Sequence, residues 1–138
     1  MATRRYLSAN EDETVAIGRQ IAESLRPDAT LLLDGDLGAG KTVLTRGVAL
    51  HLGIDPNEIQ SPTFTLIREH TGPKGQLIHA DLYRLKPEEA ETIGLEELLN
   101  GPGLKVIEWA ERLPFEVPGA VRFLLHRTDE GGREIVEE

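Results

Sequence analysis

The chain has 138 residues, with 24 acidic and 15 basic side chains and a formal net charge of −9. This length predicts a single domain over residues 1–138, and the acidic balance argues against tight direct binding of nucleic acid through a broad basic face. The absence of cysteine excludes disulfides and thiolate chemistry, and no apolar run approaches the ~20 residues of a membrane helix, so we expect a cytoplasmic protein without membrane contact.

The first part of the chain predicts a strand, a helix and a second strand. Arg4 to Ser8 alternates weakly, as an edge strand does. Apolar residues then recur at helical spacing, after a capping signal at Ser8 or Asn10 and acids that favour the positive end of a helix. Pro27 ends this helix, and the apolar run Thr30–Asp34 predicts a buried central strand.

The next eight residues, 35–42, follow the P-loop pattern Gly-x-x-x-x-Gly-Lys-Thr. Glycines let the backbone wrap a phosphate with its N–H groups pointing inward, and the following helix turns its positive end toward the same anion. Lys41 adds a mobile positive charge for phosphate oxygens, and Thr42 offers a hydroxyl to Mg²⁺. The alternative is a glycine-rich turn that only enters a helix. We expect the nucleotide to contact Gly35, Asp36, Leu37, Gly38, Ala39, Gly40, Lys41 and Thr42.

The remaining elements are short. A helix is predicted from Lys41 to about Leu52, and a five-residue loop, residues 71–75, joins two strands into an antiparallel hairpin. Short helical segments are expected at residues 87–89 and 95–99. The further strands are predicted at Phe64–His70, Gln76–Tyr83, Leu104–Ile107, Val121–Leu125 and Glu134–Val136.

The order of these elements predicts an α/β fold. We expect a P-loop NTPase-like three-layer domain with a mixed, mostly parallel sheet plus an antiparallel hairpin. The P-loop should then lie at the carboxyl end of an inner parallel strand.

Hydrolysis at a P-loop requires a carboxylate near Mg²⁺ and a group that places the attacking water. Asp81 lies toward the end of the hairpin's return strand, and Glu108 directly follows an apolar strand. Either acid, with Thr42, could belong to the metal shell, and either could orient water; a turn cap and a surface acid are the simpler alternatives. Thr63 occupies the position of a switch loop that senses the γ-phosphate, with a local turn as its alternative.

Three residues near these acids have weaker signals. His79 shares the strand face of Asp81 and is more typical of a packed histidine than of a base. Arg84 either meets a phosphate or a partner, or ends a strand in solvent. Trp109, the only tryptophan, is either a core anchor or a platform beside the nucleotide. The residues alone therefore predict a small Mg²⁺-dependent nucleotide-binding domain.

Four motifs together are far more specific than the P-loop alone: GDLGAGKT (35–42), SPTFTLIREH (61–70), HADLYRL (79–85) and VIEWAERL (106–113). In this order and spacing they resemble the TsaE family over nearly the whole chain. The resemblance implies an ATPase that uses ATP and Mg²⁺ and is weakly active when isolated. The implied role of this ATPase is to support formation of N6-threonylcarbamoyladenosine at position 37 of tRNAs that read codons beginning with A. The implied partners are TsaB and TsaD, and the chain would contact tRNA only through their complex.

The resemblance also implies roles for individual residues. It assigns Gly38, Gly40 and Lys41 to the phosphates and Thr42 to Mg²⁺. The remaining matches are the switch-like threonine Thr63, the two functional acids Asp81 and Glu108, and the tryptophan beside the site, Trp109.

Three other functions fit a P-loop. A small-molecule kinase needs an arginine-bearing lid, and no such segment is evident. A guanine-specific switch usually has an Asn-Lys-x-Asp run, which is absent. A nucleotide-dependent binding module without turnover would not need two acids near the metal.

Overall fold

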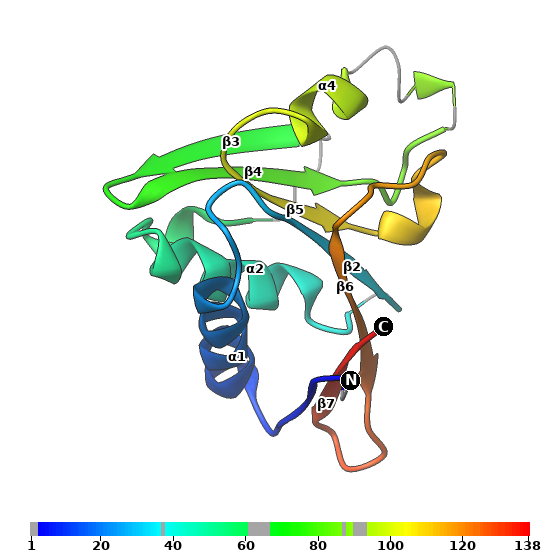
Figure 1. Cartoon of the computed structure of the whole chain (residues 1–138). Coiled ribbons are helices and arrows are strands. Elements are labelled where there is room, and N and C mark those ends of the chain that lie inside the picture. The colour runs from blue at the N-terminus through cyan, green and yellow to red at the C-terminus, as the bar shows by residue number, and fades with distance from the viewer. Residues whose placement is uncertain (1–2, 37, 61–66, 87, 90–93) are drawn as a thin grey trace.

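The seven strands that the structure describes form one mixed sheet (Figure 1). The structure is a computed structural model that describes residues 3–36, 38–60, 67–86, 88–89 and 94–138. The strands are β1 (Arg5–Ser8), β2 (Thr30–Gly35), β3 (Ile67–Gly72), β4 (Gly75–Asp81), β5 (Leu104–Glu108), β6 (Val121–Arg127) and β7 (Arg133–Glu137).

The order of strands across the sheet is β1-β7-β6-β2-β5-β4-β3. Strand β2 lies parallel to both β5 and β6, and β4 lies parallel to β5. The outer pairs β3–β4, β6–β7 and β1–β7 are antiparallel. The predicted mixed sheet is confirmed, and so is the position of the P-loop at the carboxyl end of an inner parallel strand.

Helices cover both faces of the sheet, which confirms the predicted three layers (Figure 1). The helices α1 (Glu11–Glu23) and α2 (Lys41–His51) pack in the larger apolar cluster, with Leu31 and Leu33 of β2. Leu32 points the other way, into a second cluster with α4 (Leu95–Leu99). Because successive strand side chains alternate between faces, a continuous apolar run supplies both cores. Two 3₁₀ turns, η1 (Pro56–Glu58) and η2 (Ala110–Arg112), complete the described elements.

Two glycines bring α1 and the P-loop helix α2 into close contact. A Cβ atom on Gly18 would lie 2.1 Å from the carbonyl oxygen of Leu44, and one on Gly47 would lie 2.0 Å from that of Val15. Backbone atoms cannot yield to such a group, so α1 fixes the position of α2. At the start of α1, Asn10 is the cap, and its side chain accepts a hydrogen bond from the Glu13 N–H at 2.9 Å.

The end of α1 and the hairpin loop differ from the sequence prediction. Helix α1 ends at Glu23, before Pro27, because the hydroxyl of Ser24 donates to the carbonyl of Ile21 at 2.6 Å and closes the last turn. The predicted five-residue hairpin loop is wrong, because β3 continues to Gly72 and β4 begins at Gly75.

Gly72 is required by close packing, and not by the conformation of the turn. A Cβ atom there would lie 2.4 Å from the carbonyl oxygen of Leu52, which closes the end of α2. Lys74 N–H also donates to that carbonyl at 3.1 Å. The tip of the hairpin therefore packs against the end of the P-loop helix.

Several predictions fall partly outside the described residues. They concern the beginning of the strand at Phe64 and the helical turn at residues 87–89. The predicted strands that end at Tyr83 and Ile107 instead end at Asp81 and Glu108. None of the helices within the described ranges is long and apolar enough to cross a membrane.

Candidate functional site

The P-loop backbone turns from β2 into α2 through three glycines with positive φ. Gly35 has φ 137°, and β6 lies so close that a Cβ atom there would be 2.1 Å from the carbonyl oxygen of Leu125. Gly40, with φ 101°, begins α2 without a side-chain cap, so the helix presents uncapped N–H groups to this turn. The first glycine is thus required by the sheet, and the last one leaves the start of the helix uncapped, as an anion-binding helix end would be. Leu37 lies outside the described residues.

Lys41 is turned back onto the P-loop. Its side chain is buried, and Nζ donates to the carbonyl oxygens of Gly35 at 2.5 Å and Asp36 at 2.8 Å. The same ammonium lies 4.1 Å from the ring centroid of Trp109, within cation–π range. Burial lowers the pKa of Lys41, while the nearby carboxylate of Glu108 acts against that shift. The Lys41 ammonium is therefore held by two neutral carbonyl oxygens and an aromatic ring, and an anion could replace these contacts.

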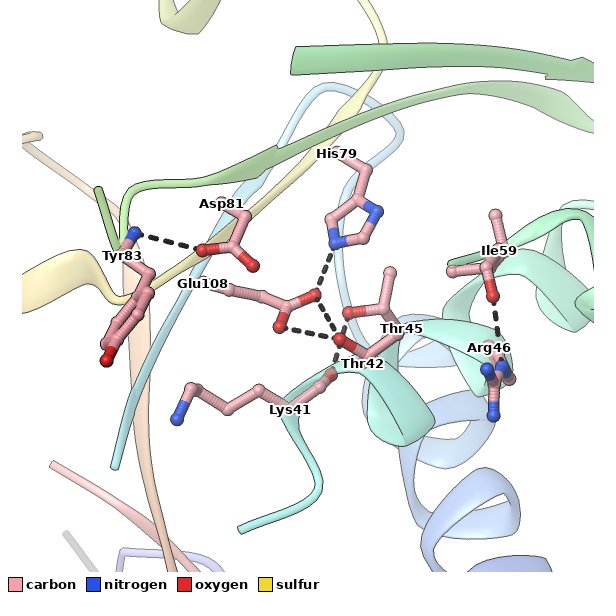
Figure 2. Close-up of polar contacts among 9 residues, drawn as sticks. All are labelled: Lys41, Thr42, Thr45, Arg46, Ile59, His79, Asp81, Tyr83 and Glu108. Atoms are coloured by element: carbon pink, nitrogen blue, oxygen red, sulfur yellow. Dashed lines mark hydrogen bonds and ion pairs between the residues drawn. The ribbon is translucent and has the colours of Figure 1, made fainter. Parts of the chain in front are cut away.

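The carboxylate of Glu108 receives side-chain contacts from two elements (Figure 2). The Thr42 hydroxyl donates to Oε1 at 2.9 Å and lies 3.1 Å from Oε2. The Nε2 atom of His79 contacts Oε2 from the other side. Glu108 is 2% exposed and His79 is 0% exposed, so this is a dry polar cluster between the sheet and α2.

Asp81 lies beside Glu108 because the two residues pair across β4 and β5. Strand alternation puts both carboxylates on the sheet face that α2 covers. One carboxylate oxygen of Asp81 accepts a hydrogen bond from the Tyr83 N–H at 2.9 Å (Figure 2). The structure therefore brings together both acids and Thr42, whereas Thr63 lies outside the described residues.

The oxygens of Thr42, Glu108 and Asp81 are hard donors, which suit Mg²⁺. The described residues hold no group of three or more His, Cys, Asp or Glu side chains that could bind a metal unaided. Mg²⁺ usually keeps waters and binds through one or two carboxylates plus substrate phosphates. The donor set therefore fits a magnesium ion that arrives with a nucleotide.

Trp109 has an unusual backbone and lies in an aromatic cluster. It has φ 59°, and it is the only non-glycine residue with positive φ in the described part of the chain. Its ring centroid lies 4.8 Å from that of Tyr83, and the Arg112 guanidinium lies 5.6 Å from the Tyr83 ring. Sequence reasoning missed Tyr83 and Arg112 as neighbours of the site. Arg84 is exposed and does not line the pocket described next.

A cavity of about 520 Å³ lies beside the P-loop and is lined in part by segments near both ends of the chain. Its lining includes the second half of the P-loop, Asp81, Glu108 and Trp109. Two further segments were missed: residues 9–11 before and at the start of α1, and residues 131–133 at the end of the β6–β7 turn and the start of β7. No local signal marks them, since they reach the P-loop only because β6 lies beside β2 and α1 lies beside α2.

A family model and relatives of known name that are similar to this chain all carry the same family name. The family model described as "Threonylcarbamoyl adenosine biosynthesis protein TsaE" matches residues 8–135. A tRNA threonylcarbamoyladenosine biosynthesis protein TsaE from Nostoc sp. is 42% identical over 130 residues, which cover 91% of this chain and 80% of the relative. The Bacillus subtilis protein of that name is 38% identical over 136 residues, covering 98% and 85%.

Among solved structures, the crystal structure of Bacillus subtilis YdiB is similar to this chain, with a TM-score of 0.75 and 35% sequence identity. The match covers 99% of this chain and 84% of that one. The sequence likeness therefore extends to the whole arrangement of the described elements.

Proposed function

The chain belongs to the TsaE family of tRNA threonylcarbamoyladenosine biosynthesis, and on this basis we propose that it is a Mg²⁺-dependent ATPase. Its activity supports formation of N6-threonylcarbamoyladenosine at position 37 of tRNAs that read codons beginning with A. It acts with TsaB and TsaD and meets tRNA only through their complex. The net charge of −9 is consistent with this indirect role.

The observation that carries the hydrolysis proposal is the contact between Thr42 and Glu108. A turn that only bound phosphate would not need a buried carboxylate against its hydroxyl, because a buried charge costs free energy. In P-loop NTPases, the P-loop Ser or Thr and a strand-end acid together hold Mg²⁺. We therefore assign Thr42 and Glu108 to the metal shell and Asp81 to the attacking water.

The other residues of the site bind and neutralise the phosphates. The uncapped N–H groups at the start of α2 face an anion, and the Lys41 ammonium moves from the Gly35 and Asp36 carbonyls to phosphate oxygens. That exchange is favourable because a phosphate oxygen carries negative charge, so the ammonium gains an opposite charge that the neutral carbonyl oxygens do not supply. When bound, Mg²⁺ supplies charge neutralisation at the phosphate oxygens. Thr63 remains the candidate for contact with the γ-phosphate.

The decisive experiment measures ADP and inorganic phosphate released from ATP and Mg²⁺, with the chain alone and with TsaB and TsaD. We expect slow release alone, clear stimulation by the partners, and equal amounts of the two products. ADP without matching phosphate would indicate transfer to an acceptor, as in a kinase. Absence of turnover under both conditions would indicate a binding module.

A further inference from the structure

His79 is a fully buried histidine whose two ring nitrogens have different surroundings. Nε2 contacts the Glu108 carboxylate, whereas Nδ1 has no hydrogen-bond partner in the described part of the chain. Buried polar atoms in native proteins are nearly always paired, and an exception requires an explanation. A histidine that merely filled the core would not account for a direct contact with a site carboxylate.

Strand geometry explains how His79 reaches Glu108. In the register of β4 and β5, His79 pairs with Val106, and Asp81 pairs with Glu108. His79 and Asp81 are two residues apart, so they share the face toward α2, and the ring reaches Glu108 diagonally. Thr42 approaches the same carboxylate from α2 (Figure 2). The carboxylate is therefore held between a strand and a helix.

The contact favours a ring form with hydrogen on Nε2. An ionised carboxylate only accepts hydrogen bonds, so Nε2 is the donor when Glu108 carries its charge. With hydrogen on Nε2 alone, Nδ1 keeps only an unpaired lone pair. Hydrogen on Nδ1 alone would place two acceptors, Nε2 and Oε2, in contact, and would bury a donor without an acceptor.

We propose that His79 is a positioning residue that holds Glu108 through its Nε2–H. The inference rests on the proposed function for its effect on turnover, although the contact itself is independent of it. When the Thr42 hydroxyl turns to a bound cation, Glu108 loses that partner, and its terminal torsion is intrinsically broad. His79 keeps its partner in both situations, so the carboxylate stays aimed at the P-loop.

Two matched variants separate this role from simple packing. In His79→Gln the amide nitrogen takes the place of Nε2, whereas in His79→Asn it takes the place of Nδ1 and does not reach Glu108. We expect His79→Asn to lower turnover about 10–100-fold, the usual effect of losing a group that orients a metal ligand. His79→Gln should retain most turnover.

Nucleotide affinity distinguishes positioning from binding. Trp109 is the only tryptophan and lies at the pocket, so its fluorescence during ADP titration reports affinity. We expect both variants to bind ADP like the wild type. Equal turnover in His79→Asn and wild type would overturn the proposal, and so would a loss in His79→Gln as large as in His79→Asn.

A measurement on the wild-type protein reads the hydrogen position directly and uses a variant only for assignment. Nitrogen-15 NMR of labelled histidines gives the hydrogen position on each ring, and the signal lost in either variant identifies His79 among the four histidines. Hydrogen on Nε2 supports the proposal, and hydrogen only on Nδ1 overturns it. If the wild type hydrolysed no ATP, the ATPase proposal would fail, while this spectrum would still decide the His79–Glu108 contact.

Discussion

The Thr42 hydroxyl oxygen lies 2.9 Å from Oε1 and 3.1 Å from Oε2 of Glu108. Thr42 is in the first turn of α2, and Glu108 is the last residue of β5. One side-chain contact therefore connects the helix that follows the P-loop to a strand that comes much later in the chain.

Replacing Glu108 with glutamine should separate binding from turnover. The amide oxygen can still accept from Thr42, but the negative charge at the candidate metal shell is lost. We expect nearly unchanged ATP affinity by calorimetry, and a fall in turnover larger than the about 10–100-fold that follows loss of a group orienting a metal ligand. Glu96→Gln, an exposed change on α4, is the control for net charge. Normal hydrolysis by Glu108→Gln would move the catalytic role to Asp81, which Asp81→Asn would then test.

Two buried lysines provide a matched pair. Lys41→Met should weaken ATP binding by about 1.5–3 kcal/mol, because a charge-assisted phosphate contact is lost. Lys105 is also buried, and its ammonium donates to the carbonyls of Asp28 and Gly101 at 2.7 Å each. Lys105→Met should lower the melting temperature and leave ATP affinity intact. Unchanged ATP affinity in Lys41→Met would contradict the assignment of the P-loop.

The left-handed backbone at Trp109 predicts an inverted order of two substitutions. Glycine adopts this conformation without strain, whereas alanine does not, so Trp109→Gly should be more stable than Trp109→Ala by about 1 kcal/mol. Urea unfolding followed by circular dichroism measures the difference. At neighbouring Ala110, which has no such φ, glycine should destabilise. Greater stability of Trp109→Ala would show that this backbone strain is not a property of the protein.

The Arg4–Glu137 pair beside β1 and β7 predicts a dependence of stability on pH. The Arg4 hydrogen bond, 3.0 Å from Nε to Oε1, holds the pKa of Glu137 below its usual value. The Glu137 carboxylate therefore takes up a proton less readily in the folded chain than in the unfolded chain. The pair therefore stabilises the fold above the usual glutamate pKa and loses its effect as the pH falls through the lowered value.

The difference in melting temperature between wild type and Glu137→Gln tests that dependence. It should be present at pH 7, correspond to about 1 kcal/mol or less because the pair is near the surface, and shrink toward about pH 3. Glu23→Gln, in an exposed pair with Arg19 on α1, should show a smaller effect. A difference that grew with acid would contradict the sign of the shift.

Local sequence predicted the residues of the site better than the contacts between them. The apolar run at residues 31–33 lies just before the P-loop, and the mainly apolar run at residues 104–107 ends at Glu108. Strand periodicity alone placed His79 and Asp81 on one face. The contact of Glu108 with both Thr42 and His79 could not be predicted, since it depends on which strands are neighbours. The role of Thr63 stays a prediction.

The errors also have a tertiary cause. Residues 71–75 contain glycine and proline and are typical of a loop, but Gly72 is small because the hairpin packs on the Leu52 carbonyl. Similarly, residues 131–132 predicted only a turn, although they line the pocket with Arg133. The sequence alone does not distinguish a glycine required for close packing from a glycine required for a turn.

The pairing of β1 with β7 has a consequence for how the chain is made. In the described sheet, β1 is an edge strand whose neighbour is β7, although β7 follows all the other described strands in the chain. A nascent polypeptide translated only as far as β6 already contains the P-loop, but its N-terminal strand lacks its partner, and the cavity lacks the lining that residues 131–133 supply. We expect such an intermediate on the ribosome to hold nucleotide poorly, so ATP capture would mark the moment when the two ends of the sheet meet.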